Sequence, residues 1–79
     1  MIFLIEYDRR EGCLVTLKSY DDAERSKAEH ARFECELELN RKGIEHEVVL
    51  LEAASEDALR RTHRRYFEDL DHLLRRRGG

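Results

Sequence analysis

The side chains in this sequence best suited to binding another molecule are four arginines in two pairs spaced four apart: Arg60, Arg61, Arg64 and Arg65. On a helix this spacing forms a ladder, and guanidinium groups bind phosphates through paired hydrogen bonds. However, Arg64 precedes Glu68 by four residues, and Arg65 precedes Asp69 in the same way, which is the spacing of helical ion pairs. The net charge is −3, and no nucleic-acid-binding signature accompanies the ladder. Nucleic-acid binding through these arginines is therefore the alternative hypothesis.

The other candidate reactive groups are four histidines and two cysteines: His30, His46, His63, His72, Cys13 and Cys35. No two histidines stand four residues apart, and no Cys-x-x-Cys motif is present, so metal-ligand spacing is missing. We expect His46 and His63 on inward faces, and both cysteines at inward positions as small apolar residues. No nucleophile motif, phosphate-binding glycine loop or fixed carboxylate pair occurs. The sequence predicts a protein that is not an enzyme and that carries no metal or cofactor.

The elements that position these residues begin with a β-hairpin around 9–12. If Gly12 adopts the left-handed conformation and closes a three-residue loop, Tyr7 opposes Val15 and Ile5 opposes Leu17. That register places six residues on one face of the sheet: Phe3, Ile5, Tyr7, Cys13, Val15 and Leu17. A third strand is predicted over Ile44–Glu52, with Val48 to Leu51 at its centre.

Two helices complete the predicted order ββαβα. The first begins with Asp21 or Asp22 as N-cap, continues to about Arg41 and ends at Gly43, which suits a left-handed C-cap. The segment 33–39 alternates like a strand, but its Glu and Leu residues and the lack of a turn signal favour helix. The second helix begins at 55–57 and extends to about Arg75. We expect one domain over 1–75 and a frayed C-terminal tail over 76–79.

The first strand is apolar on both faces, which favours a central position and the sheet order 2-1-3, although 1-2-3 remains possible. The predicted fold class is α+β, a two-layer ββαβα sandwich with a three-stranded mixed or antiparallel sheet and two helices on one face. These helices would cover the face that carries the following residues: Phe3, Ile5, Tyr7, Val15, Leu17, Ile44, Val48 and Leu50.

The helices differ in how many apolar faces they carry. An amphipathic stripe on the second predicts a core face: Leu59, Thr62, His63, Tyr66, Phe67, Leu70, Leu73 and Leu74. On the first, small residues form an inward stripe: Ala28, Ala31, Cys35 and Leu39. Phe33 and Leu37 lie about 140–180° around the axis from that stripe, at about 100° per residue. They cannot face the same neighbour.

Two apolar groups therefore lack a partner inside the predicted domain. One is Phe33 with Leu37, and the other is the second sheet face: Ile2, Leu4, Leu14, Tyr20, Val49 and Leu51. Contiguous exposed apolar patches mark interaction sites. The sequence thus predicts a small protein-interaction module that self-associates, as a homodimer, or binds another protein through the sheet face, an edge strand or the first-helix patch.

The start of the chain gives no sign of export, because its apolar run is only a few residues long before Asp8. No apolar run approaches the roughly 20 residues of a membrane span. The cysteines fit no metal or redox spacing. We expect a cytoplasmic protein without a membrane partner.

Overall fold

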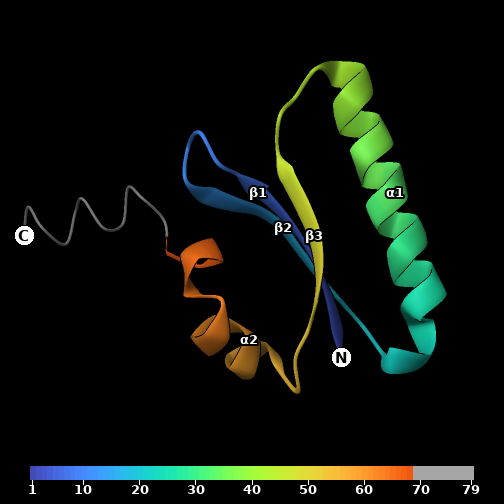
Figure 1. Cartoon of the computed structure of the whole chain (residues 1–79), viewed down its shortest axis with the longest axis vertical. Helices are drawn as coiled ribbons and strands as arrows, with labels where there is room; N and C mark the ends of the chain where they lie inside the picture. Colours follow the sequence, from blue (N-terminus) through green and yellow to red (C-terminus); the bar gives the residue numbers. More distant parts are fainter. Residues whose placement is uncertain (69–79) are drawn as a thin grey trace, which may run out of the picture.

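A computed structural model describes residues 1–68 and shows a three-stranded sheet with helices on both sides (Figure 1). Its strands are β1 (Ile2–Asp8), β2 (Cys13–Tyr20) and β3 (Glu47–Glu52). They lie in the order β2-β1-β3, and β1 is antiparallel to both neighbours. The α+β class and the favoured order 2-1-3 are confirmed.

Strand β1 owes its two apolar faces to its central position. Ile2, Phe3, Leu4, Ile5 and Tyr7 are all buried, although neighbouring side chains point to opposite sides of the sheet. The strands beside it are only half-buried along most of their length. The core of the domain is therefore built around β1, with one helical layer on each of its faces.

The first helical segment comprises a 3₁₀ turn, η1 (Asp22–Glu24), and α1 (Arg25–Lys42). At its start, the Glu24 carboxylate accepts a hydrogen bond from the Asp21 N–H at 3.0 Å, an arrangement typical of a capping box. At its end, Gly43 has φ = 67°. The Ile44 N–H donates to the Leu39 carbonyl at 2.9 Å and the Gly43 N–H to the Asn40 carbonyl at 3.2 Å. These bonds form a Schellman motif, and the predicted ends of the helix are confirmed.

The helices differ from the expected arrangement in lying on opposite faces of the sheet (Figure 1). Leu59 and Tyr66, from the second helical segment, share a buried cluster with Phe3, Ile5 and Tyr7. Helix α1 covers the other face, where the Cys35 thiol lies 3.7 Å from a carboxylate oxygen of Glu6. Each apolar face of β1 thus receives one helix, and the domain has three layers instead of two layers with both helices on one face.

The hairpin register matches the prediction at Phe3↔Ser19 and Ile5↔Leu17 but changes at a β-bulge beyond Glu6. Tyr7 pairs with Leu14 and Asp8 with Cys13, so Val15 is the extra residue. Leu14 therefore packs against the core cluster, while Val15 is 48% exposed. The assignment of Cys13 and Val15 to the face of Phe3 is wrong. The bulge allows for a loop of four residues, 9–12, in which Gly12 has the predicted left-handed conformation (φ = 68°).

The side chains of β3 point to the opposite faces of the sheet from those predicted. Leu51 pairs with Phe3 and Val49 with Ile5, so Val49 and Leu51 pack against the core cluster. Val48 and Leu50 share the face of α1. The strand begins at Glu47, not at Ile44, because Ile44 belongs to the helix-ending motif and is exposed.

The second helical segment comprises α2 (Glu56–Thr62) and a 3₁₀ turn, η2 (Arg64–Tyr66). The Ser55 hydroxyl accepts a hydrogen bond from the Ala58 N–H at 3.1 Å, so the predicted start is confirmed. The α-helix ends at Thr62, well before 75, because His63 leaves the helical conformation (φ = −125°, ψ = 53°). The predictions for Asp69, for the tail 76–79 and for four further residues lie outside the described residues: Leu70, His72, Leu73 and Leu74. Within residues 1–68, neither α1 nor α2 is long and apolar enough to cross a membrane.

Candidate functional site: the outer face of α1

The second sheet face, which was predicted to be an exposed interface, is not exposed. Ile2 is fully buried and Leu4 is 4% exposed, because α1 covers the face on which they lie. Leu14, Val49 and Leu51 lie on the opposite face and pack against the core cluster. Tyr20, the sixth residue of that predicted group, is half-buried and opposite Ile2. Assigning Ile2 and Leu4 to a contact surface is therefore wrong.

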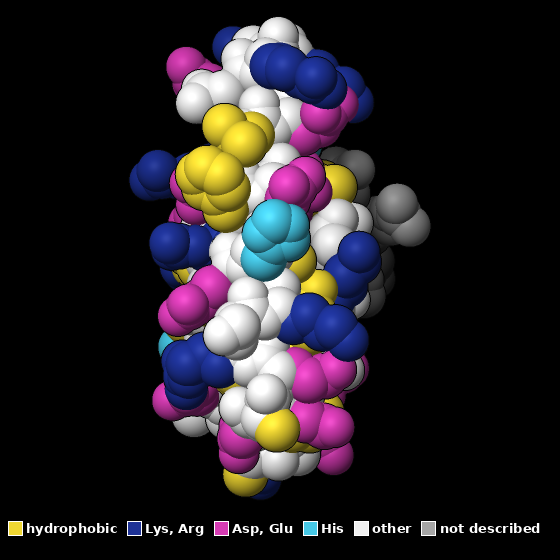
Figure 2. All heavy atoms as spheres, turned by 90° about the vertical axis from the view of Figure 1, so that its right-hand side faces the viewer, with side chains coloured by type: hydrophobic (Ala, Val, Ile, Leu, Met, Phe, Trp, Pro, Cys, Tyr) yellow, Lys and Arg dark blue, Asp and Glu magenta, His cyan; other side chains and the backbone are white. Residues whose placement is uncertain are grey.

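The other predicted group, Phe33 with Leu37, does lie on the surface. Phe33 is 58% and Leu37 48% exposed, and the two stand four residues apart on α1, where side chains are neighbours. Cys35, between them in sequence, points to the sheet and approaches Glu6. Figure 2 shows hydrophobic side chains gathered on the outer face of the molecule, surrounded by charged groups. We call Phe33 and Leu37 the α1 patch.

The α1 patch lies on a longer seam of exposed residues that repeats at intervals of four and three: Ser26, His30, Phe33, Leu37 and Asn40. This spacing is that of the contact positions in a coiled coil. Charged side chains flank the seam: Glu34 lies 3.3 Å from the seam residue His30, and Glu36 lies 3.8 Å from Arg32. Helix α1 therefore presents a narrow seam with two apolar members and charged edges.

The arginine ladder contacts carboxylates of its own chain. Arg60 lies 2.9 Å from Glu56, and its guanidinium carbon is 4.5 Å from the ring centroid of Phe67. The predicted pair of Arg64 with Glu68 is present at 3.3 Å. Arg65 instead contacts Glu47 in β3, and Arg61 is exposed. Three of the four arginines thus form ion pairs with carboxylates of their own chain, which weakens the hypothesis that the ladder binds phosphates.

Arg65 belongs to a polar cluster that attaches η2 to the sheet. The Tyr66 hydroxyl donates to Glu47 Oε2 at 2.6 Å, and an Arg65 nitrogen donates to the same oxygen at 2.8 Å. The Tyr66 ring meets Tyr7 edge-on, with centroids 5.3 Å apart. The hydrogen bond from Tyr66, together with Arg65, lowers the pKa of Glu47. Burial and the same hydrogen bond raise the pKa of Tyr66.

A second polar cluster, which was not predicted from the sequence, lies between α1 and the sheet. His46 Nδ1 is 2.6 Å from Glu6 Oε2, and His46 Nε2 is 3.5 Å from a carboxylate oxygen of Asp8. The other oxygen of Glu6 accepts hydrogen bonds from Thr16 at 3.2 Å and from Cys35 at 3.7 Å. The only sign of this cluster in the sequence is Glu6 within an otherwise apolar strand, because the members of the cluster come from separate segments.

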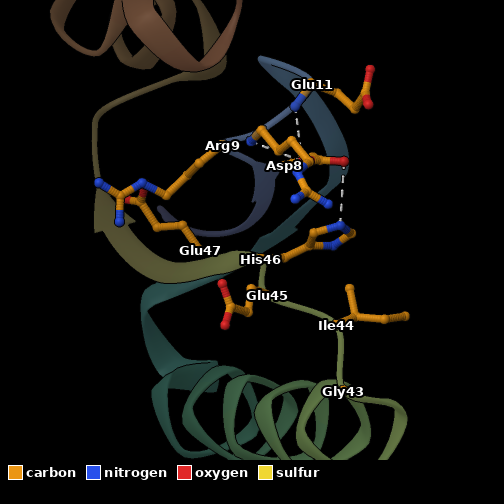
Figure 3. A pocket seen from close by; sticks show the side chains of 9 residues that line it. Asp8, Arg9, Glu11, Gly43, Ile44, Glu45, His46 and Glu47 are labelled. Carbon is orange, nitrogen blue, oxygen red and sulfur yellow. Dashed lines mark hydrogen bonds and ion pairs between the residues drawn. The ribbon is translucent and has the colours of Figure 1, made fainter.

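This second cluster joins β1, β2, α1 and the loop before β3. Burial, and next the charge of Glu6, raises the pKa of Cys35, so the thiol stays protonated and a poor nucleophile at neutral pH. Among residues 1–68, no group of three or more potential ligands is arranged to hold a metal ion. Figure 3 shows His46 turned toward Asp8 at one side of an open groove between the hairpin loop 9–12 and the loop 43–46.

Among residues 1–68, the geometry thus offers one exposed apolar surface on a helix and two polar clusters that attach neighbouring elements to the sheet. Comparison of the chain with models of protein families, with curated proteins and with solved structures finds no match in any of the three.

Proposed function

We propose that this chain is a non-enzymatic protein-interaction module that self-associates as a homodimer through the outer face of α1. The observation that carries the proposal is the exposure of Phe33 (58%) and Leu37 (48%) on the side of α1 turned away from the sheet. Neighbouring exposed apolar side chains mark interaction surfaces, and a second copy of α1 would bury them. With only two cysteines, the chain lacks the dense disulfide framework of small secreted domains, which supports a reducing, cytoplasmic location.

The size of the patch supports a reversible dimer. Fully burying a side chain the size of Leu or Phe contributes about 1.5–3 kcal/mol. Phe33 and Leu37 are already about half buried, so the four side chains of a two-fold dimer gain roughly 3–6 kcal/mol. Association costs roughly 4–15 kcal/mol in lost translational and rotational freedom. Because the free energy gained by burying the patch is comparable with the lower end of this cost, we expect a weak dimer whose fraction rises with chain concentration.

The edge strands are weaker candidates for the contact. Strand β2 carries the bulge at Val15 and an exposed lysine, Lys18, and both features discourage pairing between sheet edges. Strand β3 has only six residues and is bounded by Glu47 and Glu52. The outer face of α1 has neither obstacle.

The experiment is sedimentation velocity of the full chain from about 1 μM to about 1 mM, with two matched variants. Leu37→Glu places a charge in the patch, and Val15→Glu places one at a residue with the same exposed fraction, 48%, on β2. We expect the wild-type chain and Val15→Glu to form dimers, and Leu37→Glu to stay monomeric with unchanged circular dichroism. A wild-type monomer at all concentrations, or dimers of Leu37→Glu, would overturn the proposal.

A further inference from the structure

We propose that the two α1 helices of the homodimer lie parallel across a two-fold axis along the seam, with Glu36 of each copy paired to Arg41 of the other. This inference rests on the proposed function, since it specifies how a second copy occupies the α1 patch. The charges on the two sides of the seam favour this orientation.

The two flanks of the seam differ in charge. With His30 and Leu37 at one type of contact position and Phe33 at the other, the 3-4 spacing fixes which residues lie at the edges. One edge carries Glu29 and Glu36, and the other carries Lys27, Glu34 and Arg41; all five are exposed. The partner that fits best is the one whose edges bring opposite charges together.

An antiparallel pair brings like charges together. When Phe33 of one copy faces Leu37 of the other, each edge lies against the same edge of the second copy. Glu36 then approaches Glu36, and Glu34 approaches Glu34. Lys27 approaches Arg41 in the same way, so every one of these edge contacts is repulsive.

A parallel pair brings each acidic edge against the mixed edge of the other copy. Residues five apart then pair across the seam, which joins Glu36 to Arg41 twice by symmetry. The side chains have room to do so, because 49% of Glu36 and 74% of Arg41 is exposed. Glu29 and Glu34 also approach one another, which opposes this pairing. Glu34, Glu36 and Arg41 each have a partner on their own helix, namely His30, Arg32 and Glu38, so contacts within the helix compete with both edge contacts.

The seam itself fits the parallel orientation. In that pair Phe33 faces Phe33 and Leu37 faces Leu37, so the apolar residues meet in register. Asn40 faces Asn40, so the two amides can hydrogen-bond to each other across the seam. In the parallel pair, the repulsion between Glu29 and Glu34 is thus offset by the attraction between Glu36 and Arg41 and by the facing Asn40 amides.

The test measures the dimer dissociation constant of neutral variants. In the parallel pair, Glu36→Gln and Arg41→Gln each remove an attraction twice, so each weakens the dimer about fivefold. In the antiparallel pair each removes a repulsion, so each tightens it. The exchange variant Glu36→Arg/Arg41→Glu restores the wild-type constant only if the two residues meet in the dimer.

A cross-linking measurement provides a second readout. Ser26→Cys places two thiols opposite each other in the parallel pair, whereas the antiparallel pair separates them by about 27 Å at 1.5 Å per residue. We expect Ser26→Cys to form a covalent dimer on mild oxidation, and the wild-type chain not to. A wild-type dimer that tightens with both neutral variants and does not cross-link would overturn the parallel orientation alone. A wild-type monomer would overturn the proposed function with it.

Discussion

The His46 imidazole lies between two carboxylates of β1, with Nδ1 2.6 Å from Glu6 and Nε2 3.5 Å from Asp8 (Figure 3). The second carboxylate oxygen of Glu6 accepts hydrogen bonds from Thr16 in β2 and from Cys35 in α1. One half-buried carboxylate thus connects the central strand, an edge strand, the helix above them and the loop before β3.

We predict that His46→Ala lowers the free energy of unfolding by about 1–3 kcal/mol. The variant leaves the Glu6 carboxylate, whose side chain is only 13% exposed, without its nearest partner. Urea unfolding measured at low chain concentration gives the change. His30→Ala is the matched control, because His30 pairs with Glu34 on the exposed surface of α1, and its expected effect is within about 0.5 kcal/mol. Equal effects of the two variants would contradict a structural role for His46.

Tyr66→Phe tests the cluster on the opposite face. The phenylalanine ring can keep the edge-on contact with Tyr7, but the hydrogen bond to Glu47 is lost. We expect a loss of about 1 kcal/mol in the free energy of unfolding at neutral pH. Arg61→Gln is the control, since Arg61 is exposed on α2 and its substitution is expected to cost less than about 0.5 kcal/mol.

The same variant has a pH signature. Because the hydrogen bond from Tyr66 lowers the pKa of Glu47, the folded state binds that proton less tightly than the unfolded state does. The contribution is present above the ordinary glutamate pKa of about 4.3 and is lost as pH falls through the lower, folded value. The difference in stability between wild type and Tyr66→Phe should therefore shrink on acidification below about pH 4. A constant difference would show that the hydroxyl does not act through Glu47.

The central position of β1 could be predicted because a strand that is apolar on both faces needs cover on both. The side of each helix could not. A right-handed crossover constrains α1, but nothing local decides the face on which a terminal helix such as α2 packs. In β3, Val48 to Leu51 are all apolar, so either parity satisfies the pattern. Only pairing with β1 and packing against the core cluster distinguish Val49 from Val48.

The candidate site was predictable for a different reason. The angle between Phe33 and Cys35 around a helix depends on helical geometry alone, so opposite faces follow once the segment is known to be helical. The His46 cluster depends on long-range pairing: Glu6 and His46 are separated by 40 positions. No local pattern brings such residues together, and the bulge at Val15 changes the hairpin register by one residue.

Gly43 offers a test of the end of α1. Its φ of +67° belongs to the left-handed region, and a Cβ at this position would meet no atom within 4 Å. The cost of Gly43→Ala is therefore conformational, about 1 kcal/mol. Gly43→Asn should cost less, because asparagine tolerates this conformation better. Urea unfolding of the two variants gives the comparison, and a loss in Asn equal to or larger than in Ala would contradict this account.

The alternative of nucleic-acid binding also makes a measurable prediction. Arg60, Arg64 and Arg65 lie near carboxylates of their own chain, and the whole chain carries a charge of −3. Because electrostatic binding to nucleic acid requires cations that displace counterions from phosphates, we expect no salt-dependent binding to a labelled generic duplex or hairpin RNA in fluorescence anisotropy. The comparison variant is Arg60→Gln/Arg61→Gln/Arg64→Gln, which leaves Arg65 in place because that residue holds Glu47. Wild-type binding that weakens steeply with salt and is lost in the variant would favour the arginine face of α2 over the α1 patch as the functional surface.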